Sequence, residues 1–148
     1  MTNKSKIITT ESEEETLEVG RKIGKDLTIP CTILMEGRLG AGKTSLTRGI
    51  VWGFSGRDPR ETNVHSPTFS LVNQYESPKG MIYHIDLYRL DSLSDQYSIG
   101  LEEILYEEAL IIIEWSEKLL IQTEQNLLIH LKSETGDRRR ITIICRDT

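Results

Sequence analysis

Eight residues, Gly37 to Thr44, carry the clearest chemistry in the chain. Their sequence, GRLGAGKT, fits the phosphate-binding pattern G-x-x-x-x-G-K-[ST], the P-loop. Glycines let the backbone curl so that successive N–H groups point into one concavity, and a helix that begins there adds donors and partial positive charge. Lys43 could reach the β- and γ-phosphates of a nucleotide, and the Thr44 hydroxyl could bind Mg²⁺. The residues expected to contact nucleotide here are Gly37, Leu39, Gly40, Ala41, Gly42, Lys43, Thr44 and Ser45.

Two acidic residues could complete such a site. Glu114 directly follows the apolar, β-branched run of residues 109–113, so a strand ending there would place a carboxylate beside the P-loop. Asp86 ends a second strand-like stretch and could equally hold the metal ion or orient an attacking water. Either could instead pair with Arg89, and the sequence alone does not rank the two for the metal. His84 shares a strand face with Asp86, and we interpret it as structural.

Three further features near the expected site have two interpretations each. Trp115 could line the nucleotide site or belong to the core. Thr68, in the sequence SPT at the end of a polar loop, could deliver a hydroxyl that senses the γ-phosphate, or simply start a strand after proline. The basic run 138–140 could contact phosphate, but surface charge is the interpretation we favour.

The P-loop needs a strand before it and a helix after it, and the sequence supplies both. Residues 32–35 form a short apolar run that is typical of a buried strand. Leu46, Ile50 and Phe54 recur at intervals of four, which predicts one apolar stripe on a helix over residues 45–54. The order of strand, glycine loop and helix is the context that supports the motif.

An earlier helix is expected to begin at Ser12, which forms an S-x-x-E capping box with Glu15. Gly20 and Gly24 lower the helix propensity of this segment, and they could instead permit close approach to another element. Residues 12–16 are also a candidate for contact with an adenine ring.

The remaining pattern predicts one α/β domain over residues 1–148. We expect a three-layer sandwich of the P-loop NTPase type, with a mixed central sheet. Its two central strands, 32–35 and 109–113, should be parallel, and antiparallel hairpins should extend the sheet. Further strands are expected at residues 6–9, 68–75, 81–87, 126–132 and 140–145, with a short acidic helix from 101 to about 108.

Composition narrows the class of protein. The formal net charge of −5 argues against a protein built mainly to hold a nucleic-acid backbone, which would need a basic face. Cys31 and Cys145 are the two cysteines, and both are expected to be free thiols. No apolar run approaches the length of a membrane span, and no signal-peptide pattern follows Met1, so the cytoplasm is the expected location.

Four stretches together resemble the TsaE (YjeE) family: the P-loop at 37–44, SPTF at 66–69, HIDLYRL at 84–90, and Glu114 with Trp115. Their order and spacing match, and the similarity runs from about residue 12 to 143. The P-loop alone is shared by many families, whereas the combination is specific. The family usually has Asp in place of Arg38, a side chain expected to point away from phosphate. The hairpin order Gly136, Asp137, Arg138 departs from the family's Gly-Arg pair, so no nucleotide contact is expected of Arg138.

The resemblance implies an ATPase that supports N6-threonylcarbamoyladenosine synthesis at adenosine 37 of tRNAs reading codons that start with A. It implies ATP and Mg²⁺ as cofactors and the TsaB–TsaD pair as partner, with tRNA reached mainly through that complex and no membrane contact. Carried over, Lys43 and Thr44 bind phosphate and Mg²⁺, and Thr68 belongs to a switch-like loop. Asp86 and Glu114 are the functional carboxylates, with Glu114 preferred for the metal.

Other P-loop functions remain possible from the sequence. A small-molecule kinase is the main alternative, although the chain has no arginine-rich lid and little length for a second substrate pocket. A GTPase would commonly carry an N-K-x-D stretch, which is missing from the sequence. A protein that holds nucleotide without hydrolysing it is the third.

Overall fold

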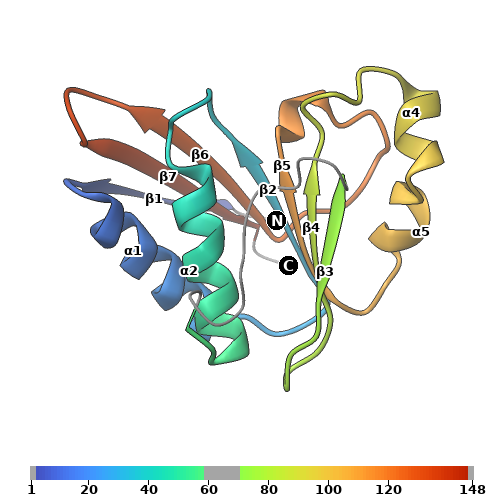
Figure 1. Cartoon of the computed structure of the whole chain (residues 1–148), viewed down its shortest axis with the longest axis horizontal. Coiled ribbons are helices and arrows are strands. Elements are labelled where there is room, and N and C mark those ends of the chain that lie inside the picture. The colour runs from blue at the N-terminus through green and yellow to red at the C-terminus, as the bar shows by residue number, and fades with distance from the viewer. Residues whose placement is uncertain (1–2, 59–70, 147–148) are drawn as a thin grey trace.

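The computed structural model describes residues 3–58 and 71–146, which form one sheet with helices on both faces (Figure 1). Within these residues seven strands lie in the order β1-β7-β6-β2-β5-β4-β3. The elements are β1 (Asn3–Thr10), α1 (Glu13–Lys25), β2 (Cys31–Glu36), α2 (Lys43–Ser55), β3 (Val72–Tyr75), β4 (Ile82–Asp86), α4 (Leu93–Ser98), α5 (Leu101–Leu105), β5 (Leu110–Glu114), the short 3₁₀ helix η1 (Ser116–Lys118), β6 (Leu127–Ser133) and β7 (Arg139–Arg146).

Parallel pairing runs through the middle of the sheet. β2 pairs in parallel with both β5 and β6, and β5 pairs in parallel with β4. On the flanks, β3 lies antiparallel to β4, and β7 lies antiparallel to both β6 and β1. The predicted mixed sheet with antiparallel hairpins is confirmed, and the carboxyl ends of β2, β4 and β5 meet at one edge.

The helices form a layer on each side of the sheet. α1 and α2 cover one face, and α4 and α5 cover the other (Figure 1). The side chains of β5 divide between two apolar clusters, with Leu110 and Ile112 in one and Ile111 and Ile113 in the other. Because consecutive strand residues face opposite sides, a continuously apolar strand needs cover on both. The three-layer α/β sandwich is therefore confirmed.

The structure departs from the sequence-based predictions most clearly between residues 68 and 108. α4 has no counterpart among them, although Ser92 caps this helix by accepting a hydrogen bond from the Asp95 N–H (3.0 Å). α5 ends at Leu105 because the next N–H groups bond three residues back, which tightens and stops the helix. The strand expected over 68–75 begins at Val72 in the described part of the chain, and residues 68–70 lie outside it.

The backbones of α1 and α2 lie in close contact. Ser12 begins α1 by accepting a hydrogen bond from the Glu15 N–H (3.1 Å), as the capping box predicts. A Cβ atom at Gly20 would lie 2.9 Å from the Cα of Gly49 on α2, closer than side-chain carbons pack. The glycines of α1 therefore permit the close approach considered from the sequence. This packing fixes α2, whose first residue is Lys43 of the P-loop.

Gly24→Ala should destabilise the protein. Its Cβ would overlap the Ile50 carbonyl oxygen and lie 2.8 Å from the Phe54 nitrogen, both on the backbone of α2. Alanine would favour the helix by up to about 1 kcal/mol, but separating two packed helices costs about 1–3 kcal/mol. We expect a lower urea midpoint for Gly24→Ala and less than about 0.5 kcal/mol change for Lys22→Ala, an exposed position on the same helix. An unchanged or raised midpoint for Gly24→Ala would contradict this packing.

Candidate functional site

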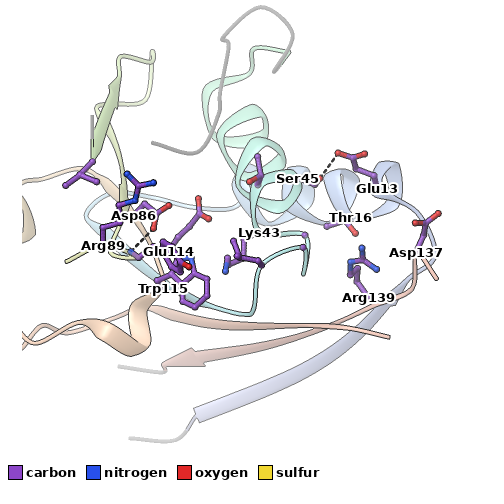
Figure 2. Close-up of a pocket in the computed structure, with 16 residues that line it drawn as sticks. Glu13, Thr16, Lys43, Ser45, Asp86, Arg89, Glu114, Trp115, Asp137 and Arg139 are labelled. Atoms are coloured by element: carbon purple, nitrogen blue, oxygen red, sulfur yellow. Dashed lines mark hydrogen bonds between the residues drawn. The ribbon is translucent and has the colours of Figure 1, made fainter. Parts of the chain in front are cut away.

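A cavity of about 610 Å³ opens where the P-loop meets the carboxyl ends of β4 and β5. Small-molecule sites commonly measure about 300–1,000 Å³. Figure 2 shows two groups of side chains, one at the ends of β4 and β5 and one from α1 and the β6–β7 turn, with Lys43 between them. The lining residues are Glu13, Thr16, Leu39, Gly40, Gly42, Lys43, Thr44, Ser45, Leu71, Asp86, Tyr88, Arg89, Glu114, Trp115, Asp137 and Arg139.

The P-loop backbone takes the shape that its glycines allow. Gly40 and Gly42 have positive φ angles of 80° and 100°, which place both in the left-handed region. Gly42 caps α2 without a side-chain hydrogen bond, and its carbonyl accepts from the Leu46 N–H (3.0 Å). The loop therefore turns sharply into the first turn of a thirteen-residue helix, the geometry that suits an anion.

The Lys43 ammonium lies inside the cavity and is held from several sides. It donates to the carbonyl oxygen of Gly37 and lies 3.9 Å from the centre of the Trp115 ring. Burial lowers the pKa of Lys43, while the carboxylates of Glu114, Glu117 and Asp86 raise it. A phosphate that binds beside such a desolvated cation and the N–H groups of a helix N-terminus would stabilise the charged form of the lysine, because its oxygens replace the lost water.

Trp115 has a strained backbone conformation, and its ring packs against that of Tyr88. It has a φ angle of 58°, a left-handed conformation that costs a non-glycine residue of order 1–3 kcal/mol. The ring lies 4.8 Å from that of Tyr88, centre to centre, at an interplanar angle of 48°. This backbone conformation directly after β5 turns the indole toward Lys43, so Trp115 lines the cavity as the nucleotide-site interpretation requires.

Asp86 and Glu114 end two neighbouring parallel strands in register. Asp86 is the partner of Glu114 in the β4–β5 ladder, and both line the cavity. Glu114 is only 2% exposed and bonds Nε2 of the fully buried His84. Asp86 accepts a hydrogen bond from the Tyr88 N–H (2.9 Å). Burial raises the pKa of Asp86, the Tyr88 N–H lowers it, and the Glu114 charge raises it again.

The side chains at this end of the cavity suit a magnesium ion. Thr44 contributes a hydroxyl, and Asp86 and Glu114 contribute carboxylates, which are the hard oxygen donors that Mg²⁺ prefers. Mg²⁺ is usually held by one or two carboxylates together with phosphate oxygens and water. In the described residues, no three His, Cys, Asp or Glu side chains form a metal cluster of their own.

The opposite end of the cavity is polar and is tied to α2. Glu13 accepts a hydrogen bond from the Ser45 hydroxyl (3.0 Å), and the Thr16 hydroxyl bonds that of Thr10 (2.7 Å). Arg139 lines this end, contrary to the surface interpretation of the basic run. That interpretation holds for Arg138, which pairs with Glu11 at 3.0 Å. Arg138 belongs to the turn before β7, whereas Arg139 is the first residue of the strand, so the basic run divides between the surface and the cavity.

The structure brings most of the predicted site residues together. Of the predicted P-loop contacts, Leu39, Gly40, Gly42, Lys43, Thr44 and Ser45 line the cavity, as do Asp86, Glu114 and Trp115. Gly37 and Ala41 do not line it. Gly37 accepts the Lys43 hydrogen bond, and the Ala41 side chain is 2% exposed in the core. Thr68 lies outside the described residues. Their roles toward ATP and Mg²⁺ stay predictions.

Several lining residues come from parts of the chain far from the P-loop. Glu13 and Thr16 fall within residues 12–16, the candidate for adenine contact, and Arg139 falls within the basic run 138–140. Tyr88 and Asp137 line the cavity without having been expected there, and Arg89 reaches it from a turn after β4. His84 is structural in its burial, but it contacts Glu114 directly. The alternating pattern over 84–86 places His84 on the same strand face as Asp86. That Glu114 is the partner of His84 follows only from the β4–β5 register.

The fold and the site define an α/β protein of the P-loop NTPase type. Comparisons with known proteins narrow this class. The model of the family "Threonylcarbamoyl adenosine biosynthesis protein TsaE" matches residues 10–141. The chain therefore belongs to the TsaE family.

Relatives and solved structures agree with that membership. The chain is similar to tRNA threonylcarbamoyladenosine biosynthesis protein TsaE of Rickettsia conorii, with 38% identity over 137 residues that cover 92% of this chain and 76% of the relative. The TsaE protein of Haemophilus influenzae is 37% identical over 115 residues, 77% of this chain and 70% of its own length. The crystal structure of Bacillus subtilis YdiB superposes with a TM-score of 0.74 at 26% identity, covering 98% of this chain and 88% of YdiB.

Asp86→Asn should stabilise the protein at neutral pH. Because burial raises the pKa of Asp86, its charged form is disfavoured in the fold, so stability is lost as pH rises through the folded pKa. Asparagine stays neutral and can still accept the Tyr88 hydrogen bond. We expect Asp86→Asn to raise the unfolding temperature at pH 7, with a gain that shrinks as the pH is lowered and the parent carboxyl takes up its proton.

The control for this prediction is Asp26→Asn, an exposed carboxylate at the end of α1, which should show no comparable gain. Equal stability of Asp86→Asn and the parent at pH 7 and below would contradict the described burial of Asp86.

Proposed function

We propose that this protein binds ATP with Mg²⁺ and hydrolyses it, and that its ATP cycle supports threonylcarbamoyl transfer to adenosine 37 of tRNA by a TsaB–TsaD pair. The observation that carries the proposal is a single cavity shared by the P-loop and two strand-end carboxylates. Lys43 and Thr44 line it from the loop, and Asp86 and Glu114 line it from β4 and β5. A glycine-rich turn without a binding role would not be expected to share a cavity with two carboxylates from neighbouring strands.

Each side chain has a distinct task in this proposal. Lys43 and the loop N–H groups bind the phosphates, and the Thr44 hydroxyl and Glu114 hold the magnesium ion. The ion, when bound, neutralises charge that develops on the β- and γ-phosphate oxygens. Asp86 orients the attacking water, and Thr68, which lies outside the described residues, is assigned the sensing of the γ-phosphate. Trp115 shields Lys43 from solvent at the edge of the cavity.

The polar end of the cavity is suited to the nucleoside. Glu13, Thr16, Asp137 and Arg139 line it on the far side of the P-loop from Asp86 and Glu114 (Figure 2). Carboxylates and hydroxyls can accept and donate hydrogen bonds to a ribose or a base edge. We therefore place the nucleoside there, and the terminal phosphate between Lys43 and the two carboxylates.

The partners follow from membership in the TsaE family and from charge. The relatives carry the name tRNA threonylcarbamoyladenosine biosynthesis protein, and this chain has a formal net charge of −5. An acidic protein gains little from the phosphate backbone, so tRNA is contacted mainly through the TsaB–TsaD complex. Within the described residues, no helix has the length and apolar character needed to cross a membrane. The cytoplasm, where tRNA is modified, is the proposed location.

Lys43→Ala should lose at least about tenfold in ATP affinity, since charge-assisted hydrogen bonds to phosphate contribute about 1.5–3 kcal/mol. Titration calorimetry with ATP and Mg²⁺ checks this, with circular dichroism to show that the fold is retained. The control is Lys25→Ala, an exposed lysine at the end of α1. Equal ATP affinity of Lys43→Ala and the parent would refute the role given to this lysine.

Glu114→Gln should weaken Mg²⁺-dependent hydrolysis more than it weakens the fold. The amide keeps the volume of Glu114 but removes the charge that a metal ion prefers. Hydrolysis measured over a range of Mg²⁺ concentrations should show a requirement raised by about tenfold or more. Glu102→Gln is the control, because this exposed carboxylate on α5 does not line the cavity. If the Mg²⁺ curves of Glu114→Gln and the parent coincide, the metal role passes to Asp86.

Phosphate release from ATP, measured with and without purified TsaB and TsaD, tests the function as a whole. We expect slow hydrolysis by the protein alone and faster hydrolysis with both partners. ATP binding with no hydrolysis under either condition would contradict the ATPase assignment.

A further inference from the structure

Arg89 occupies a tight turn between β4 and α4, at the mouth of the cavity. The Leu90 N–H donates to the Leu87 carbonyl (3.0 Å), which closes a four-residue turn with Tyr88 and Arg89 at its centre. Leu87 is fully buried and Leu90 is 6% exposed, so both flanks of the turn are anchored in the core. Arg89 itself is exposed and lines the cavity on the side of Asp86 (Figure 2).

Hydrogen bonds fix the backbone of this turn to the rest of the site. The Leu87 N–H donates to the carbonyl oxygen of Glu114 (3.1 Å), and the Tyr88 N–H donates to the Asp86 carboxylate (2.9 Å). The Lys118 ammonium donates to the Tyr88 carbonyl (2.6 Å). The turn is therefore held by the same two carboxylate residues that line the cavity, which orients the Cα of Arg89 before any ligand arrives.

Across residues 3–58 and 71–146, the Arg89 guanidinium has no hydrogen-bond or ion-pair partner. Other arginines are paired: Arg21 bonds Glu18 at 2.7 Å, and Arg138 bonds Glu11 at 3.0 Å. Two carboxylates lie at the same side of the cavity, yet Arg89 pairs with neither, contrary to the pairing considered from the sequence. A guanidinium is always charged and offers five donors in a planar fork.

The position of Arg89 along the cavity identifies the part of a nucleotide it would meet. Thr44 and Glu114 would hold a magnesium ion, which in P-loop proteins accompanies the β- and γ-phosphates, so the carboxylate end is the proposed end for the terminal phosphate. Arg89 lies at that end and Arg139 at the other, with Lys43 between them (Figure 2). Among the described lining residues, each end of the cavity therefore has one arginine, and Arg89 is the one at the end proposed for the terminal phosphate.

We propose that Arg89 binds the terminal phosphate of a nucleoside triphosphate and stabilises the charge of the transferring phosphoryl group. This inference rests on the proposed hydrolysis of ATP. Water adds to the γ-phosphorus, the bond from that phosphorus to the β–γ bridging oxygen breaks, and the electron pair leaves with ADP. The protons of the water end on inorganic phosphate and in solvent. Arg89 donates to equatorial oxygens during this step, so its contacts are stronger in the transition state than in the bound substrate.

The test compares Arg89→Ala with Arg57→Ala, in the full chain and with partners present. Arg57 is exposed just beyond the carboxyl end of α2, whereas the P-loop is at the other end of that helix, so this control removes one charge away from the cavity. Arg89→Ala should lower kcat on the order of 10²-fold, the loss typical of one transition-state donor. Its Kd for ADP should stay within about twofold of the parent value, because ADP lacks the phosphate that Arg89 contacts.

Affinity for ADP with aluminium fluoride and Mg²⁺, a mimic of the transferring phosphoryl group, gives a readout that does not depend on turnover. Arg89→Ala should lose this tight complex and Arg57→Ala should keep it. Equal loss of ADP and ADP–aluminium fluoride binding would overturn the proposal, because Arg89 would then serve general binding or folding. Full kcat in Arg89→Ala would also overturn it. A parent protein without hydrolysis would instead contradict the proposed function.

Discussion

Parallel pairing of β2, β5 and β4 is the constraint on which the rest of the structure depends. Parallel neighbours bring their carboxyl ends to one edge of the sheet. Each of these strands delivers one chemical group there: the P-loop after β2, Glu114 at the end of β5 and Asp86 at the end of β4. A shift of one residue in the β4–β5 register would turn one carboxylate to the opposite face. The apolar clusters on both sides of β5 oppose such a shift. The packing of the core therefore also fixes where the two carboxylates lie.

The site holds charges that the fold alone does not satisfy. Burial lowers the pKa of Lys43 and raises that of Asp86, so both charged forms are disfavoured in their surroundings. Trp115 keeps a left-handed backbone beside them. Strain and desolvation of this kind are typical of functional sites, where a ligand supplies the missing compensation. A triphosphate with its magnesium ion would supply charges of both signs in one molecule.

Local patterns in the sequence predict the scaffold because they are properties of neighbouring residues. The four-residue period of Leu46, Ile50 and Phe54 predicts α2, and the unbroken apolar run before Glu114 predicts a strand covered on both faces. The contacts that complete the site are not local. His84 meets Glu114 only through the strand register, and Arg139 enters the cavity because β7 returns beside the P-loop. Arg89 depends on a turn that is anchored by Glu114 and Lys118, which lie 27 and 30 positions after the turn residues that they contact.

In the proposed function, one cavity binds a triphosphate and its metal ion between the P-loop and two strand ends. Crystals grown with Mn²⁺ and a non-hydrolysable ATP analogue test it most directly, because the anomalous signal of manganese locates the metal independently of any model of the nucleotide. The predicted peak lies within coordination distance, about 2.0–2.3 Å, of the Thr44 hydroxyl and a phosphate oxygen, directly or through water from the Glu114 carboxylate. A peak outside the cavity, or a triphosphate bound away from Lys43, would contradict the account.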